Sequence, residues 1–169
     1  MARMHTLGIG AALLVGSSVL YADWGTTHWG DSVEQVIAAV GGNAKVDKGN
    51  RDQRVFDQDR LASSTGELNG IAVRTEYFFD VKGGLSLVQA SPQDVGGCKR
   101  FVESFMRLGK PDSQDVKPMP PFVLKTWEWA DAANNLKTQL VLIEGVKVSF
   151  APCHVTYSPA AAAKPPAGN

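Results

Sequence analysis

The chain has 169 residues, and its 17 lysines and arginines balance its 17 aspartates and glutamates, so that its formal net charge is zero. Neither sign of charge clusters along the sequence, which argues against a nucleic-acid partner, because binding to phosphates depends on concentrated lysine and arginine. One domain of this length can bury a sizeable core without a metal ion or many disulfides.

The first 22 residues have the layout of a secretory signal peptide. Arg3 lies in a short polar start, an apolar run extends from Leu7 to Leu20, and small residues surround Ala22. The run has about 14 residues, fewer than the roughly 20 that a helix needs to cross a bilayer. We expect cleavage near Ala22, no integral membrane segment afterwards, and a periplasmic or secreted protein. An uncleaved anchor is the alternative, because Leu20 and Tyr21 depart from an Ala-x-Ala cleavage site.

A short amphipathic helix is predicted next. Asp31 suits its N-cap, and Glu34 can reach back to the backbone N–H of Asp31 in a capping box. Gly41 and Gly42 supply the left-handed backbone that ends a helix. A helix of about ten residues is marginal by itself. We therefore expect its apolar face to pack on a sheet, and this face comprises Val33, Val36, Ile37 and Val40.

Two strands are predicted after a polar, charged stretch over residues 43–60. The strands span residues 70–81 and 85–91, and the turn Lys82-Gly83-Gly84 joins them into a hairpin. Tyr77 and Phe79 lie on the inward face of the first strand. Asp57 and Asp59, in the polar stretch, are expected in a solvated loop.

The sequence then predicts a second helix and an extended connection. Ser91 can act as the N-cap, Pro92 fits the first turn, and an apolar face runs from Cys98 to Leu108 before Gly109 closes the helix. Gly96 and Gly97 weaken the early part, so the firm helix is expected nearer Cys98. The proline-rich segment 110–122 is expected to be an extended connection.

The remaining sequence alternates with a period of two, which is typical of strands. Residues 122–131 and 136–145 flank a turn at 132–135, and residues 146–150 and 154–158 complete the predicted sheet after a break at Ala151-Pro152-Cys153. We expect one domain over residues 23–157 and a disordered tail over 158–169. The predicted fold is α+β, an antiparallel sheet with two helices packed on one face.

The two cysteines, Cys98 and Cys153, are expected to form a disulfide, because an exported protein meets an oxidising environment. The bond would close a loop of about 55 residues, which stabilises a fold by roughly 4 kcal/mol in the chain-entropy description. The alternative is an enzyme that uses Cys98 as a thiolate nucleophile with His154 as its base. Because Cys153 adjoins His154, the geometry of such a dyad equally predicts the disulfide.

No pattern of residues indicates a metal ion or another cofactor. A zinc site needs three or four compact ligands, whereas His28 and His154 are the only histidines after the signal segment. We therefore expect no cofactor and no metal site.

Several of these features together resemble small exported bacterial proteins of the BamE-like and β-lactamase-inhibitor-like folds. The resemblance rests on the start of the first helix, the aromatic strand, the second helix with its Gly-Lys-Pro ending, and the last hairpin; the residues are Trp29-Gly30-Asp31-Ser32 with Val36, Phe78 and Phe79, 98–108, Gly109-Lys110-Pro111, Trp127 and 138–145. It implies an envelope accessory or inhibitor module that binds another protein. A lipid anchor of the BamE kind is not implied, because no cysteine follows the apolar run.

Aromatic and apolar side chains are the expected recognition residues, because tryptophan removes a large area from water while it still donates an N–H. The function expected is a binding or accessory module for an envelope or secreted protein or peptide, without catalysis; a structural envelope protein with no single partner is a further alternative. Trp127 and Trp129 share one strand face, so they can equally belong to the core. The candidate binding residues are Trp24, Met119, Phe122, Trp127 and Trp129.

Overall fold

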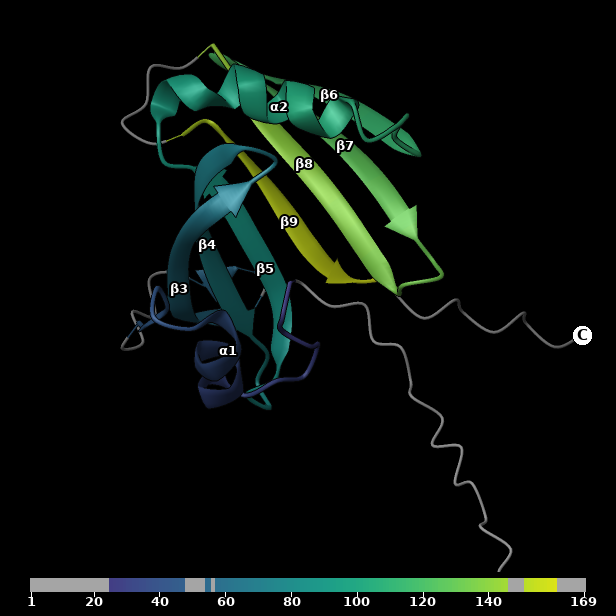
Figure 1. Ribbon diagram of the computed structural model, residues 1–169. Coiled ribbons are helices and arrows are strands. Elements are labelled where there is room, and N and C mark those ends of the chain that lie inside the picture. Colours follow the sequence, from purple (N-terminus) through teal and green to yellow (C-terminus); the bar gives the residue numbers. More distant parts are fainter. Residues whose placement is uncertain (1–24, 48–53, 56, 146–150, 161–169) are drawn as a thin grey trace, which may run out of the picture.

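The computed structural model describes residues 25–47, 54–55, 57–145 and 151–160 (Figure 1). Within these residues, nine antiparallel strands form one open sheet. The strands follow each other across the sheet in the order β1 (Lys45–Val46), β3 (Gln58–Leu68), β4 (Ile71–Phe79), β5 (Leu85–Pro92), β9 (Cys153–Pro159), β8 (Leu136–Glu144), β7 (Phe122–Asp131) and β6 (Ser113–Met119), and β2 (Arg54–Val55) pairs with β3.

Strand β9 joins the two halves of the sheet. It pairs with β8 over seven residue positions, from Leu136↔Pro159 to Leu142↔Cys153. Its other edge pairs with β5 over three positions, of which Val88↔Tyr157 and Ala90↔Val155 are the outer two. The last of the described strands therefore lies in the middle of the sheet.

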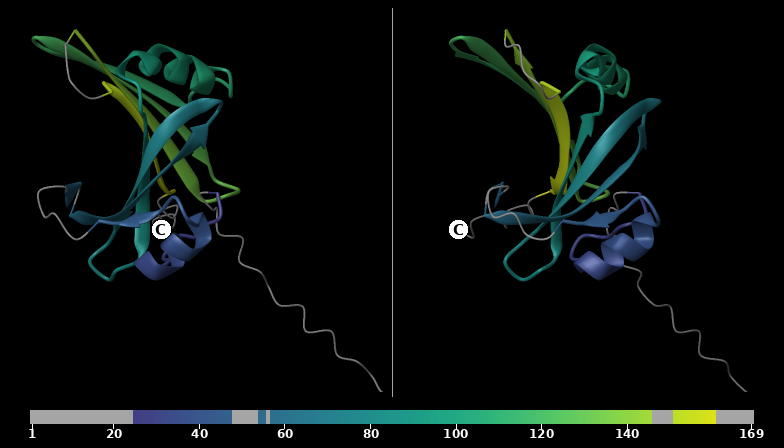
Figure 2. Two further views of the ribbon diagram at one scale, coloured as in Figure 1. Left: turned by 60° about the vertical axis from the view of Figure 1, so that its left-hand side comes forward. Right: turned by 90° about the vertical axis from the view of Figure 1, so that its left-hand side faces the viewer.

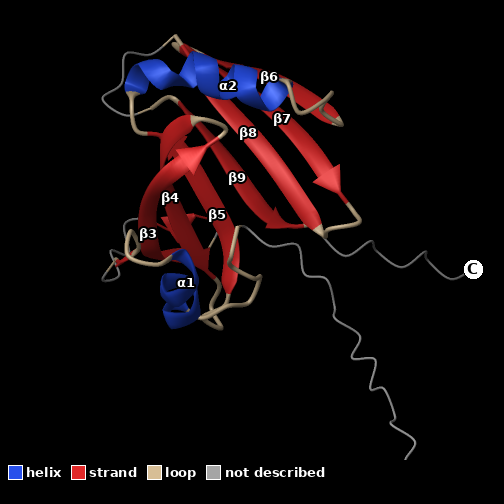
Figure 3. Ribbon diagram, in the orientation of Figure 1, coloured by secondary structure: helices blue, strands red, loops and turns tan. Residues whose placement is uncertain are grey.

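The two helices lie on the same side of the sheet, which is strongly twisted (Figures 2 and 3). Helix α1 (Val33–Val40) lies against β3, and α2 (Cys98–Met106) lies against β8. One continuous core fills the space beneath them, because strand residues on that face alternate with outward ones. Its fully buried members include Val36 of α1, Phe101 and Phe105 of α2, and Val88, Leu140 and Val155 of the sheet. The structure confirms the predicted α+β fold, with an antiparallel sheet and both helices on one face.

Helix α1 begins one residue later than predicted. Its N-cap is Ser32, whose side chain accepts a hydrogen bond from the backbone N–H of Gln35, while the Gln35 side chain accepts one from the Ser32 N–H. Asp31, the predicted cap, instead accepts the backbone N–H of His28 at 2.7 Å. The Asp31 carbonyl also accepts the N–H of Leu85 at 2.8 Å. Tertiary contacts therefore place Asp31 before the helix.

Helix α2 is fixed to the sheet by the disulfide and by an aromatic pair. Cys98, its first residue, is bonded to Cys153, the first residue of β9, with the two Cα atoms 5.7 Å apart. The rings of Phe101 and Phe105 meet edge to face at 5.1 Å. The predicted disulfide and the predicted start of the helix near Cys98 are confirmed.

Three predictions around α2 were wrong. Ser91 and Pro92 end strand β5, and the turn that follows is a 3-10 helix (Val95–Gly97) capped by Asp94, whose carboxylate accepts the N–H of Gly96. Leu108 lies beyond the end of the helix and is exposed. The proline-rich connection contains strand β6, which pairs with β7 through all seven of its residues.

The polar stretch before β4 also differs from the prediction. Strand β3 follows residue 57 and pairs with β4 over nine positions, from Asp59↔Phe79 to Leu68↔Ile71. Asp59 is therefore in a strand, whereas Asp57 is exposed in a left-handed turn. Ser158 and Pro159 belong to β9 and not to a tail. The predicted signal peptide, the segment 146–150 and residues 161–169 of the predicted tail lie outside the described residues.

Candidate binding groove on the open face

The face of the sheet opposite the two helices, here called the open face, carries a groove of about 610 Å³. Its walls come from the middle of β4, the second half of β5, the start of β9 and the end of β8. The side chains that give it chemical character are Arg74, Glu76, Gln89, Ser91 and His154.

Strand alternation places these polar side chains together. Val73, Thr75 and Tyr77 of β4 are buried under the helices, so Arg74 and Glu76 between them point to the open face. The antiparallel register sets Arg74 opposite Ser91 and Glu76 opposite Gln89. The groove is thus lined by two cross-strand pairs.

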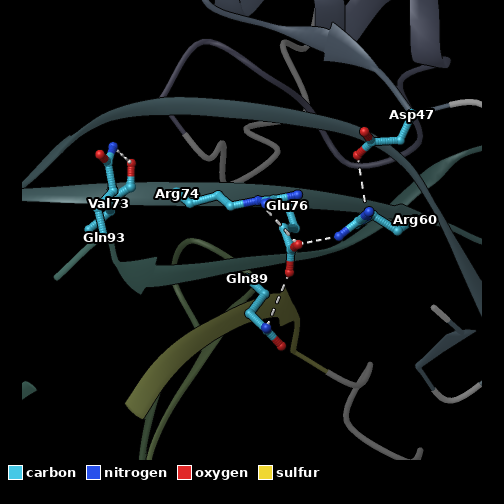
Figure 4. A network of polar contacts seen from close by, with 7 residues as sticks. All are labelled: Asp47, Arg60, Val73, Arg74, Glu76, Gln89 and Gln93. Carbon is cyan, nitrogen blue, oxygen red and sulfur yellow. Dashed lines mark hydrogen bonds and ion pairs between the residues drawn. The ribbon is translucent and has the colours of Figure 1, made fainter. Parts of the chain in front are cut away.

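A buried arginine organises the acidic groups beside the groove (Figure 4). Arg60 of β3, whose side chain is only 12% exposed, forms ion pairs with Glu76 and with Asp47, the latter at 3.2 Å from its Nε. The amide of Gln89 donates to the second oxygen of Glu76 at 3.5 Å. Glu76 is therefore held on three sides by strands β3, β4 and β5.

Arg74 is held much more loosely than Arg60. Its side chain is 51% exposed, and its Nε lies 3.4 Å from Glu76, which is longer than the 2.7–2.9 Å typical of a charge-assisted hydrogen bond. Arg74 also lines a neighbouring hollow of about 270 Å³, with Lys45, Asp47 and Ser63 on its walls. A half-exposed cationic side chain therefore lies between two depressions in the open face.

His154 closes the groove on the β9 side. It is partly buried, and burial lowers the pKa of its imidazole below the usual value. A neutral imidazole carries one donor and one acceptor nitrogen. His154 therefore offers the groove a hydrogen-bonding group without a charge.

The structure separates the two members of the alternative thiol dyad. The sulfur of Cys98 is bonded to Cys153 beneath α2. His154 follows Cys153 in the same strand and so points to the opposite face of the sheet. The dyad of Cys98 and His154 is not assembled in this fold.

The aromatic residues expected to bind a partner divide into two groups. Trp127 is 9% exposed and belongs to the core. Trp129 packs against the core under α2. Its indole N–H donates a hydrogen bond to the carbonyl of Gly109 at 3.2 Å. Met119 is exposed at the end of β6, and Phe122, opposite it in β7, is partly buried. Trp24 lies outside the described residues.

The sequence singled out only His154 among these groove residues as a functional group, and it did so as a base for Cys98, although it does place Arg74 and Glu76 on the outward side of a strand. The pattern that indicated this is the alternation of Arg74 and Glu76 with inward-facing residues that include Tyr77 and Phe79. That β9 brings His154 next to β5 depends on the topology of the sheet.

The described residues include no group of three or more histidine, cysteine or acidic side chains arranged to hold a metal ion. Across the same residues, no helix has both the length and the apolar character of a membrane span. In comparisons with known proteins, the chain matches no protein-family model, no curated protein and no solved structure.

Proposed function

We propose that this protein is an exported binding module without catalytic activity, which recognises a protein or peptide partner through the groove on its open face. The observation that carries the proposal is the half-exposed, weakly paired guanidinium of Arg74 inside a polar groove. The segment it recognises carries a carboxylate. An arginine fork binds a carboxylate through two parallel hydrogen bonds, which gives both affinity and orientation.

The charges around the groove favour an acidic ligand. Across the groove, the neighbouring hollow and the ion pairs between them, Lys45, Arg60 and Arg74 supply three positive charges, while Asp47 and Glu76 supply two negative charges. Buried Arg60 engages both carboxylates, so the excess positive charge resides on the exposed side chains. A ligand carboxylate competes with Glu76 for Arg74 at small cost, because their present contact is long.

Two further considerations support an exported partner. A disulfide between Cys98 and Cys153 is consistent with an oxidising compartment. The resemblance to envelope accessory and inhibitor proteins implies that the partner is itself an envelope or secreted protein.

The proposal is tested by nuclear magnetic resonance on the oxidised, isotope-labelled chain. Two pools of extended hexapeptides are titrated, one with a single glutamate at each position and one with glutamine there instead. We expect the glutamate pool to shift the amide signals of Arg74, Gln89 and Ser91, with about tenfold weaker binding for the glutamine pool, because one charge-assisted hydrogen bond contributes about 1.5–3 kcal/mol.

The matched variants are Arg74→Gln and Arg100→Gln. Arg100 is exposed on α2 and lies outside the groove, so its variant should bind as the natural chain does, while Arg74→Gln should lose the preference for glutamate. Equal binding of both pools, or a preference that survives Arg74→Gln in a variant with an unchanged spectrum elsewhere, contradicts the proposal.

A further inference from the structure

Among the described residues, β6 is a long outer strand whose one partner is β7. It pairs with β7 on one side, and all seven of its residues, from Ser113 to Met119, are exposed. At the other end of the described sheet lie the two-residue strands β1 and β2. A long outer strand presents a row of backbone donors and acceptors that can pair with another strand.

The hairpin geometry identifies the backbone groups of β6 that face outward. Only Pro120 and Pro121 separate Met119 from Phe122, so these two residues form the hydrogen-bonded pair that closes the hairpin. Alternation then directs the N–H groups of Gln114 and Val116 away from β7. The backbone nitrogen of Pro118 also points away from β7. This agrees with the preference of prolines in edge strands to turn their nitrogen away from the sheet.

The charge pattern of β6 is complementary to itself. Asp115 and Lys117 flank Val116 and point to the same face as Thr126 and Leu124, their partners in β7. In an antiparallel pair of two such strands centred on Val116, Asp115 of each copy lies opposite Lys117 of the other. Both contacts are opposite-charge cross-strand pairs, which stabilise a sheet.

We propose that two copies of this chain associate edge to edge through β6, so that the sheet continues across a two-fold axis. Val116, whose side chain is 47% exposed in the single chain, forms the central reciprocal hydrogen-bonded pair. The N–H of Gln114 donates to the carbonyl of Pro118 in the second copy. Only the missing N–H of Pro118 leaves a ladder position unfilled.

The same pattern excludes neighbouring registers. A shift of two residues in one direction sets Asp115 opposite Asp115 of the second copy, and a shift in the other direction sets Lys117 opposite Lys117. Like charges placed directly opposite destabilise a strand pair. A shift of one residue reverses which face each side chain occupies. The register centred on Val116 is therefore specified by charge as well as by hydrogen bonding.

The test is sedimentation of the oxidised full chain over a range of concentrations, with Asp115→Lys and Lys117→Asp as the principal variants. Each variant alone places like charges in both contacts, and we expect its dimer dissociation constant to rise at least about tenfold. An equimolar mixture of the two variants restores both attractive contacts, and so does the doubly reversed chain D115K/K117D. Both should dimerise as the natural chain does.

A control variant, Lys110→Asp, changes an exposed lysine before β6 and should leave the dissociation constant unchanged. Thermal unfolding of every variant confirms that each is folded. A natural chain that stays monomeric up to about 1 mM, the weak limit of specific association, overturns the proposal. A dimer that the single variants do not weaken, or that the mixture does not restore, overturns it equally. The edge and the groove use different residues, so either proposal can fail without the other.

Discussion

Removal of the bond between Cys98 and Cys153 should cost more stability than any single surface change in this protein. The two residues are 55 positions apart. In the chain-entropy description, a closed loop of that length removes about 14 cal/mol/K from the unfolded chain, which corresponds to about 4 kcal/mol at 25 °C. The bond also links the first residue of α2 to the first residue of β9, so its loss releases the helix from the centre of the sheet.

Urea unfolding followed by tryptophan fluorescence measures this effect. With a slope of about 2 kcal/mol/M for a domain of this size, reduction should lower the midpoint by about 2 M. Reduction by a phosphine keeps both side chains in place, whereas the double variant Cys98→Ala/Cys153→Ala also removes buried sulfur atoms. The double variant should therefore be less stable than the reduced natural chain.

The comparison separates the cross-link from the packing. If reduction moves the midpoint by less than about 0.5 M while the double variant moves it by about 2 M, the cysteines stabilise the fold through packing alone. Closure of the 55-residue loop would then contribute little to the stability of the fold.

Three further changes have defined outcomes. Phe105→Ala should cost about 3–5 kcal/mol in urea unfolding, because the ring is 1% exposed and packs on Phe101 and Trp129; a cost below about 1 kcal/mol would show that α2 does not anchor the core. Burial lowers the pKa of His154 in the folded protein. Above about pH 6.5 the imidazole is neutral in both the folded and the unfolded chain, and below that pH the unfolded chain takes up the proton first. Stability should therefore fall as the pH drops, by up to about 1.4 kcal/mol per pH unit from this group; His154→Gln should flatten the dependence of the midpoint on pH, and an unchanged slope would contradict the assignment. Ser32→Ala removes the cap of α1 and should cost about 1 kcal/mol by thermal unfolding, with no loss expected if the helix were capped elsewhere.

The sequence predicted those strands whose large side chains alternate regularly. In β4, Tyr77 and Phe79 are buried and Arg74 and Glu76 are not, which is the pattern expected of a strand with one covered face; Phe78, on the other face, departs from it because it is buried as well. The same reasoning located the two hairpins on either side of Gly83 and of the turn at 132–135. Two cysteines in a chain that was expected to be exported were enough to predict the disulfide.

The sequence did not reveal β3, because its buried residues are small or polar. Ala62 and Ser64 lie under the helices opposite Tyr77 and Thr75 of β4. The hydroxyl of Ser64 is 3.1 Å from the hydroxyl of Tyr77, so burial is offset by a hydrogen bond. The bulk of Tyr77 fills the space that a large residue in β3 would need.

Strand β6 escaped prediction for a different reason. All its residues are exposed, so no side of it has an apolar pattern, and Pro118 argues locally against a strand. The site was equally inaccessible, since a groove formed by Arg74, Gln89 and His154 requires β9 to lie beside β5. That neighbourhood follows from the topology and not from any local pattern.

The central position of β9 has a consequence for the way the chain acquires its structure. Of the described strands it is the last to emerge from a ribosome or a translocation channel, yet β5 and β8 meet only through it. Until it arrives, both strands have open edges that can pair wrongly with other chains. Cys153 arrives with it, so oxidation of the thiols also waits. Closure of the sheet between β5 and β8 therefore waits for β9.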